Sequence, residues 1–168
     1  MIYLGIDPGK TGGVAILKED GTLELHTIPV IGKEVDLKSL NEIIFNATRE
    51  EHIVCLEDVH AIPGTGAGSN FEFGRIKGLK EGMLVGMQAT YVMLAPKTWQ
   101  KTMWQGIPLQ KKATGGNDTK ATSLLAARRW FPKETFLATA RSSKPHDGLV
   151  DSALMAMCLK LTYGKAPK

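Results

Sequence analysis

The chain has 168 residues, of which 43% are hydrophobic and 23% are charged, as is typical of a globular domain with its own core. We therefore expect one domain over residues 1–168. No apolar stretch is long enough to cross a bilayer, and no basic region precedes an apolar run at the N-terminus, so neither a membrane span nor a signal peptide is expected. Cys55 and Cys158 stand alone in apolar segments, which indicates buried thiols in the cytoplasm rather than a disulfide framework.

The net charge of +4 is unevenly distributed along the chain. Residues 97–144 include ten basic and two acidic side chains, a net charge of +8, so the rest of the chain carries −4. A basic segment beside an acidic remainder is typical of a nucleic-acid-binding protein that also holds acidic catalytic groups. A solvated, lysine-rich surface would have the same composition.

The order of the predicted elements indicates an α/β fold. Three consecutive strands are expected over 2–7, 12–18 and 22–29, with tight turns at Pro8-Gly9 and Asp20-Gly21. An amphipathic helix over 36–51 and a buried strand over 52–58 follow. The remaining predicted elements are a helix over 71–88, a strand over 90–94, and helices over 96–104, 118–130 and 147–162. We therefore predict a mixed sheet flanked by helices.

Asp7 ends the first predicted strand. Side-chain alternation places Tyr3, Gly5 and Asp7 on one face and the neighbouring apolar residues on the other. A carboxylate at this position is costly to bury unless it is paired, and a metal ion would be a suitable partner. Alternatively, Asp7 serves the turn that follows, because Asp-Pro-Gly is a favourable turn sequence.

Three further carboxylates lie where a core would normally resist them. Glu57 ends the fourth strand, and Asp147 and Asp151 share one face at the start of the last helix. Because like charges repel at this spacing, a positive group is expected beside them; Asp147 alternatively caps the helix. Such oxygen ligands suit Mg²⁺ or Mn²⁺. Two such ions about 3.5–4 Å apart would clamp the attacking and leaving oxygens of a phosphodiester.

Glycines recur at every fourth position of the predicted helix over 71–88, at Gly74, Gly78, Gly82 and Gly86. Each glycine lowers the stability of a helix by about 1 kcal/mol relative to alanine. The stripe therefore predicts that another backbone approaches this helix closely. A neighbouring helix, a partner subunit and a nucleic-acid backbone would each fit.

Together these features resemble the RuvC family of Holliday junction resolvases. The motif Ile6-Asp7-Pro8-Gly9, the strand-end Glu57, the basic segment and the Asp147/Asp151 helix occur in the family's order. The closest likeness is to RuvC-like phage proteins, through runs similar to 95–101, 118–123, 130–132 and 146–148. The resemblance implies a ribonuclease H-like fold with a five-stranded mixed sheet whose first three strands are antiparallel.

The resemblance also implies an activity. It indicates a homodimer in the cytoplasm of a bacterium or phage-infected host, with the glycine-striped helix at the dimer interface. The dimer would bind four-way DNA junctions and nick two opposed strands with two Mg²⁺ or Mn²⁺ ions per site. No small-molecule cofactor and no membrane partner are expected.

Site residues follow from the same resemblance. The implied metal ligands are Asp7, Glu57, Asp147 and Asp151, with His146 as a further candidate, and Lys101 and Lys120 would contact the scissile phosphate. The last two acidic residues are four apart here but three apart in better-known members, which leaves open which of His146, Asp147 and Asp151 bind metal. The expected DNA contacts are Lys111, Lys112, Lys120, Arg128, Arg141 and Lys144. Phe71 and Phe73 are candidates for stacking on an unpaired base, or for core packing.

Three other functions fit part of the pattern. Asp-x-Gly followed by Thr and Gly resembles the first phosphate loop of actin-like ATPases and sugar kinases, although those need two such domains. A resolvase-like protein could bind junctions without cutting them. A related nuclease could act on flaps, forks or RNA.

Overall fold

The first strand, β1 (Ile2–Ile6), lies buried in the middle of a five-stranded sheet. The computed structural model describes residues 1–60, 64 and 66–164. The other strands of this sheet are β2 (Gly13–Lys18), β3 (Leu23–Thr27), β6 (His52–Glu57) and β7 (Tyr91–Leu94). Their order is β3-β2-β1-β6-β7. Strand β2 is antiparallel to both β3 and β1, and β6 is parallel to both β1 and β7. The predicted mixed sheet is confirmed.

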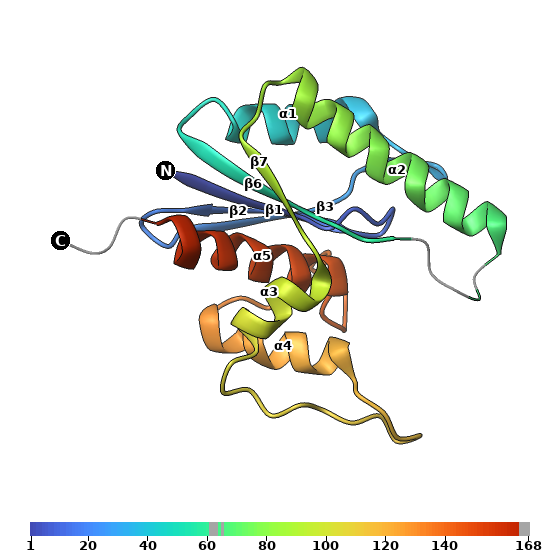
Figure 1. Ribbon diagram of the computed structural model, residues 1–168, viewed down its shortest axis with the longest axis vertical. Helices are drawn as coiled ribbons and strands as arrows, with labels where there is room; N and C mark the ends of the chain where they lie inside the picture. Colours follow the sequence, from blue (N-terminus) through green and yellow to red (C-terminus); the bar gives the residue numbers. More distant parts are fainter. Residues whose placement is uncertain (61–63, 65, 165–168) are drawn as a thin grey trace.

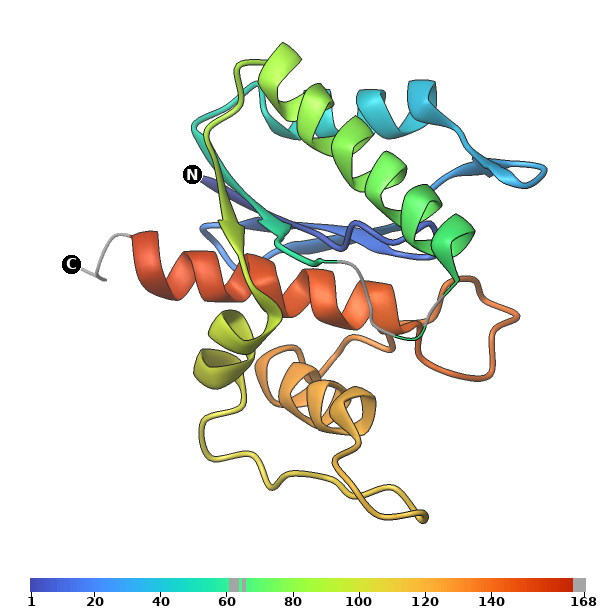
Figure 2. The same cartoon turned by 45° about the vertical axis from the view of Figure 1, so that its right-hand side comes forward.

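Helices cover both faces of the sheet (Figure 1). On one face lie α1 (Leu37–Ala47) and α2 (Ala67–Gly86); on the other lies α5 (Asp147–Tyr163), with α3 (Pro96–Met103) and α4 (Thr119–Trp130) beyond it. Figure 2 shows the same layers turned by 45° about the vertical axis. None of these helices is long and apolar enough to span a membrane.

Most element boundaries agree with the predictions to within a few residues. Helix α2 begins four residues before the predicted start, because the polar, glycine-rich residues 67–70 are helical although their composition suggests a loop. Asp118 is the N-cap of α4, and its Oδ1 accepts a hydrogen bond from the Ala121 amide at 3.0 Å. A small hairpin of β4 (Val30–Ile31) and β5 (Glu34–Val35) was not predicted; its strands of two residues each are too short to give a periodic pattern.

Side-chain alternation along β1 separates two hydrophobic clusters. Ile2, Leu4 and Ile6 belong to the cluster under α1 and α2, while Tyr3 belongs to the cluster under α5. A Cβ at Gly5 would overlap the backbone of Ser152 and Ala156, so glycine there lets α5 lie directly on β1. This close approach brings the start of α5 to the end of β1, where Asp7 lies.

The glycine stripe of α2 faces open space. A Cβ at Gly74, Gly78, Gly82 or Gly86 would meet no described atom of the chain within 4 Å. The alternative that a neighbouring helix of the same chain packs on the stripe is therefore wrong. Close packing within the chain instead involves Gly5, Gly13 and Gly148, whose backbones contact their neighbours. A partner subunit or a nucleic acid remains the expected occupant of the α2 surface.

Candidate active site

Parallel pairing of β1 and β6 brings two of the predicted carboxylates to one end of the sheet. Ile6 pairs with Leu56, so Asp7 and Glu57 are the next residues along neighbouring strands. Helix α5 packs across β1, with the backbone at Ser152 against Gly5, which places the adjacent Asp151 at the same end. Three elements far apart in sequence therefore converge here (Figure 2).

Asp7 adopts the turn conformation that the Asp-Pro-Gly sequence predicts. Its Oδ1 accepts a hydrogen bond from the Gly9 amide at 2.9 Å, and its own amide donates to the Gly13 carbonyl at 3.0 Å. The turn interpretation is therefore confirmed. It does not compete with metal binding, because a carboxylate has more acceptor sites than one hydrogen bond uses.

Glu57 is a buried carboxylate held by a tryptophan. Burial is the main reason that its pKa rises to about 7, and the negative charge of Asp7 raises the pKa further. The indole Nε1 of Trp99 donates a hydrogen bond to Glu57 Oε1 at 2.9 Å, which favours the charged form and partly offsets burial. Trp99 is fully buried on α3 and so fixes the Glu57 side chain. This role was missed, because it depends on how α3 packs against β6.

Asp151 carries an unsatisfied carboxylate oxygen. Burial raises its pKa to about 7, a hydrogen bond with Ser123 opposes this rise, and the negative charges of Asp7, Glu57 and Asp147 add to it. Its Oδ1 is buried and has no hydrogen-bond partner among the described residues. The four carboxylates therefore lie within electrostatic reach of one another.

Lys120 is the positive group beside the two helical aspartates. Its Nζ lies 2.5 Å from Asp147 Oδ2, although both side chains are more than half exposed. This hydrogen bond and the Asp147 charge raise the pKa of Lys120. His146, rather than Asp147, is the N-cap of α5, and its Nδ1 accepts a hydrogen bond from the Leu149 amide at 3.4 Å. The alternative that Asp147 caps this helix is wrong.

The donor chemistry of the four carboxylates fits a hard divalent cation. Their oxygens are the ligands that Mg²⁺ and Mn²⁺ prefer, and an unpartnered buried oxygen such as Asp151 Oδ1 is the kind of atom that a cation satisfies. Within residues 1–60, 64 and 66–164, no three His, Cys, Asp or Glu side chains stand close enough together to hold one ion. Mg²⁺ is commonly bound through one or two carboxylates, with water molecules completing its coordination.

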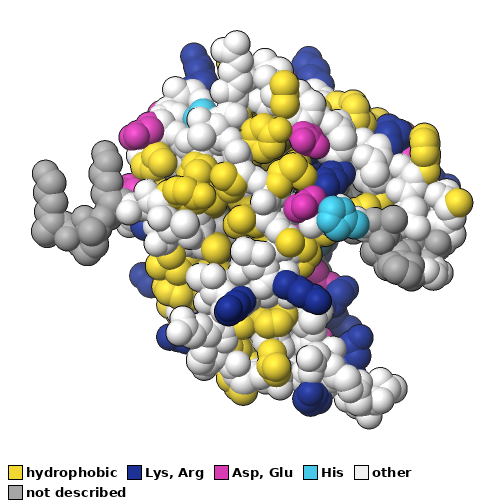
Figure 3. Space-filling model, viewed as in Figure 1, with side chains coloured by type: hydrophobic (Ala, Val, Ile, Leu, Met, Phe, Trp, Pro, Cys, Tyr) yellow, Lys and Arg dark blue, Asp and Glu magenta, His cyan; other side chains and the backbone are white. Residues whose placement is uncertain are grey.

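The other predicted site residues are mostly exposed. Lys101 lies on the surface of α3 and makes no hydrogen bond or ion pair with the four carboxylates in the described structure. The predicted DNA contacts on α4 and its flanking segments, Lys111, Lys112, Arg128, Arg141 and Lys144, are all exposed. Figure 3 shows Lys and Arg side chains on the α3–α4 side of the molecule. Phe71 is 74% exposed, so core packing is wrong for it, whereas Phe73 is partly buried.

Lys80 of α2 is a second residue that sequence analysis missed. It is fully buried, and its Nζ donates hydrogen bonds to the carbonyl oxygens of Asp7 and Gly9, each at 3.0 Å. Burial lowers its pKa to about 8, and the Asp7 charge opposes this shift. A signal was present, since Lys80 lies at four-residue spacing from the buried Ile76 and Leu84. A lysine in the middle of a buried stripe indicates a specific partner.

Comparison with known proteins identifies the fold. No protein-family model and no curated protein sequence matches the chain. RuvC of Thermus thermophilus in complex with a Holliday junction substrate matches with a TM-score of 0.61 at 15% identity, over 98% of this chain and 95% of that chain. The chain has the RuvC fold. A further T. thermophilus RuvC structure matches with a TM-score of 0.54 at 17% identity, over 96% and 97% of the two chains.

A eukaryotic structure gives the same result. The yeast mitochondrial Holliday junction resolvase matches with a TM-score of 0.55 at 15% identity, over 92% of this chain and 75% of that chain. The expected RuvC-like, ribonuclease H-like fold is therefore confirmed over nearly the whole chain. At these identities the likeness concerns the fold, and the roles of individual residues remain predictions.

Proposed function

We propose that the protein is a metal-dependent endonuclease that resolves four-way DNA junctions. The observation that carries this proposal is the convergence of four electrostatically coupled carboxylates from β1, β6 and α5 at one end of a RuvC-like sheet. The matching structures described above include RuvC in complex with a Holliday junction substrate and a yeast mitochondrial Holliday junction resolvase. The exposed basic side chains of residues 97–144 would bind the phosphate backbone of the DNA.

Asp7, Glu57 and Asp151 would hold Mg²⁺ or Mn²⁺, with Asp147 and His146 as further candidates. Two such ions would activate a water molecule and stabilise the leaving 3′ oxygen. Trp99 would keep Glu57 oriented toward the site through the hydrogen bond to Oε1. The pKa values of Glu57 and Asp151, both near 7, mean that protons compete with cations for these oxygens at neutral pH.

Incubation with a synthetic four-way junction and Mg²⁺ tests this function. We expect paired nicks in opposed strands of the junction, and none in a linear duplex or a single strand of the same sequence. Flap and fork substrates in the same assay would reveal a broader nuclease. Junction binding without any nicking, with Mg²⁺ or Mn²⁺, would contradict the proposal and identify a non-cleaving junction-binding protein.

Lys120 is expected to act in the chemical step. Its ammonium group lies beside Asp147, one of the four carboxylates, and could exchange this ion pair for one with a DNA phosphate. We expect Lys120→Ala to slow single-turnover cleavage by about 100-fold, with junction affinity within about twofold of wild type. Lys112→Ala, in the exposed loop before α4, is the control and should weaken binding without a comparable loss of rate. An equal loss of binding and rate in Lys120→Ala would make Lys120 a phosphate contact only.

The open glycine stripe of α2 is expected to lie in a dimer interface. A Cβ at Gly78 would meet no described atom within 4 Å, and leucine has a higher helix propensity than glycine, so we expect the Gly78→Leu monomer to remain as stable as wild type. In sedimentation velocity, we expect this variant to dissociate at concentrations where wild type is dimeric. Lys38→Leu, exposed on α1, is the control and should leave the dimer intact. An unchanged dimer in Gly78→Leu would exclude the stripe from the interface.

A further inference from the structure

Helix α2 directs a buried ammonium group at the backbone of the Asp7 turn. Lys80 is fully buried between Ile76 and Leu84, and its Nζ donates to the carbonyl oxygens of Asp7 and Gly9, each at 3.0 Å. Burying a charged group costs several kcal/mol unless its partners compensate, and an apolar residue would fill this position without that cost. The lysine therefore does something that packing alone does not require.

A second lysine of α2 holds the other carboxylate-bearing strand end. Lys77 lies one turn before Lys80, and its Nζ donates to Asp58 Oδ1 at 2.8 Å and to the Val59 carbonyl at 3.2 Å. Asp58 and Val59 directly follow Glu57, the last residue of β6. The two lysines thus fasten the segments after β1 and β6 to the same helix.

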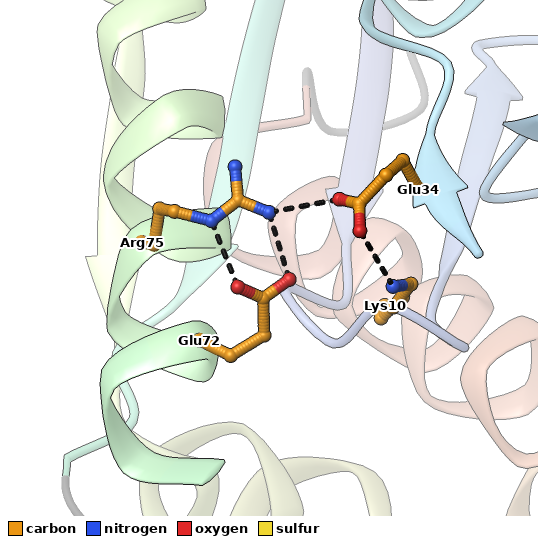
Figure 4. A network of polar contacts seen from close by, with 4 residues as sticks. All are labelled: Lys10, Glu34, Glu72 and Arg75. Carbon is orange, nitrogen blue, oxygen red and sulfur yellow. Dashed lines mark hydrogen bonds and ion pairs between the residues drawn. The ribbon is translucent and has the colours of Figure 1, made fainter. Parts of the chain in front are cut away.

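The turn after β1 is also tied to α2 at the surface (Figure 4). Arg75 of α2 pairs with Glu72 at 2.7 Å and with Glu34 of β5 at 3.1 Å, and Glu34 lies 3.9 Å from the Nζ of Lys10. Lys10 directly follows Gly9. These contacts are exposed and individually weak, so the buried Lys80 contributes the main constraint.

We propose that Lys80 is a positioning residue for the metal site. It would fix the Asp7-Pro8-Gly9 backbone so that the Asp7 carboxylate is presented beside Glu57 and Asp151, while Lys77 fixes the Glu57 end. This inference rests on the proposed function, because it assumes that the carboxylates bind a divalent cation. It also makes α2 the element that connects the site with the open glycine stripe on the surface.

Mn²⁺ affinity of the DNA-free protein, measured by isothermal titration calorimetry, tests the positioning role. Lys80→Met keeps the unbranched chain and removes the ammonium group. We expect it to weaken Mn²⁺ binding by at least about tenfold, as residues that orient metal ligands commonly do, while the melting temperature without metal is unchanged or higher. Lys38→Met on α1 is the control and should bind Mn²⁺ like wild type.

A double-mutant cycle distinguishes positioning from a general effect on stability. If Lys80 acts through Asp7, Lys80→Met should lower Mn²⁺ affinity no further in the Asp7→Asn protein, which already lacks the charge that Lys80 positions. If Lys80→Met fails to fold, Lys77→Met should still weaken Mn²⁺ binding by about threefold, because this side chain is partly exposed. Unchanged Mn²⁺ affinity in the folded variant would overturn the positioning role alone. A wild-type protein that binds Mn²⁺ but leaves junctions uncut would instead contradict the proposed function alone.

Discussion

Asp7→Asn, Glu57→Gln and Asp151→Asn are each expected to reduce junction cleavage by at least about 10³-fold, or about 4 kcal/mol of transition-state stabilisation. Each substitution keeps the shape of the side chain and removes its charge. A divalent cation loses an anionic ligand, and neither Asn nor Gln replaces the charge. Single-turnover cleavage of a four-way junction at saturating protein is the measurement.

Junction binding in EDTA serves as the control for these variants. Affinity should stay within about twofold of wild type, because phosphate contacts by the basic segment dominate binding. Asp20→Asn, in the exposed turn before β3, should cleave at the wild-type rate. A variant that cuts at a near wild-type rate would remove its residue from the site. The cleavage rates of Asp147→Asn and His146→Ala, compared with that of Asp151→Asn, would show which residues at the start of α5 are needed for cleavage.

The sheet and the position of its carboxylates were predictable because they depend on local patterns. Alternation along β1 assigns each side chain to a face, and the turn chemistry of Asp-Pro-Gly joins β1 to β2. Once β1 and β6 are neighbours, Asp7 and Glu57 must lie at the same end of the sheet.

The contacts that the supporting residues make were not predictable, because they depend on tertiary packing. Trp99 and Lys80 reach the site from α3 and α2, and no sequence spacing relates them to Glu57 or Asp7. The glycines also show that regular spacing in the sequence does not by itself indicate a contact within the chain. The stripe at Gly74–Gly86 is regular but contacts nothing described in the chain, whereas the isolated Gly5 admits α5 against the sheet.

Without divalent metal, the protein is expected to lose stability as the pH rises from 5 to 7.5. The pKa values of Glu57 and Asp151 are about 7 in the folded protein, against about 4.3 and 3.9 in an unfolded chain. The folded state therefore binds more protons than the unfolded state across this window, and the free energy of unfolding falls as the pH rises. The stability that these two raised pKa values contribute is fully present below pH ~4 and is lost as the pH rises through ~7.

The expected loss is a few kcal/mol, because each unit of pKa difference is worth about 1.4 kcal/mol and the two carboxylates interact with each other. Lys80, with a pKa of about 8, changes the slope only near and above pH 8. Urea unfolding in EDTA at pH 5 and pH 7.5 is the measurement. Asp151→Asn should flatten the dependence, whereas Asp20→Asn should retain it, because the pKa of Asp20 is lowered and lies below the window.

Saturating Mg²⁺ should reverse this trend in the wild-type protein, since a cation binds the charged carboxylates and adds stability as they deprotonate. The same Mg²⁺ should give Asp151→Asn much less stabilisation at pH 7.5. A wild-type protein whose stability in EDTA rises between pH 5 and pH 7.5 would mean that Glu57 and Asp151 are ionised without cost. No cation would then be needed to compensate the burial of these two carboxylates.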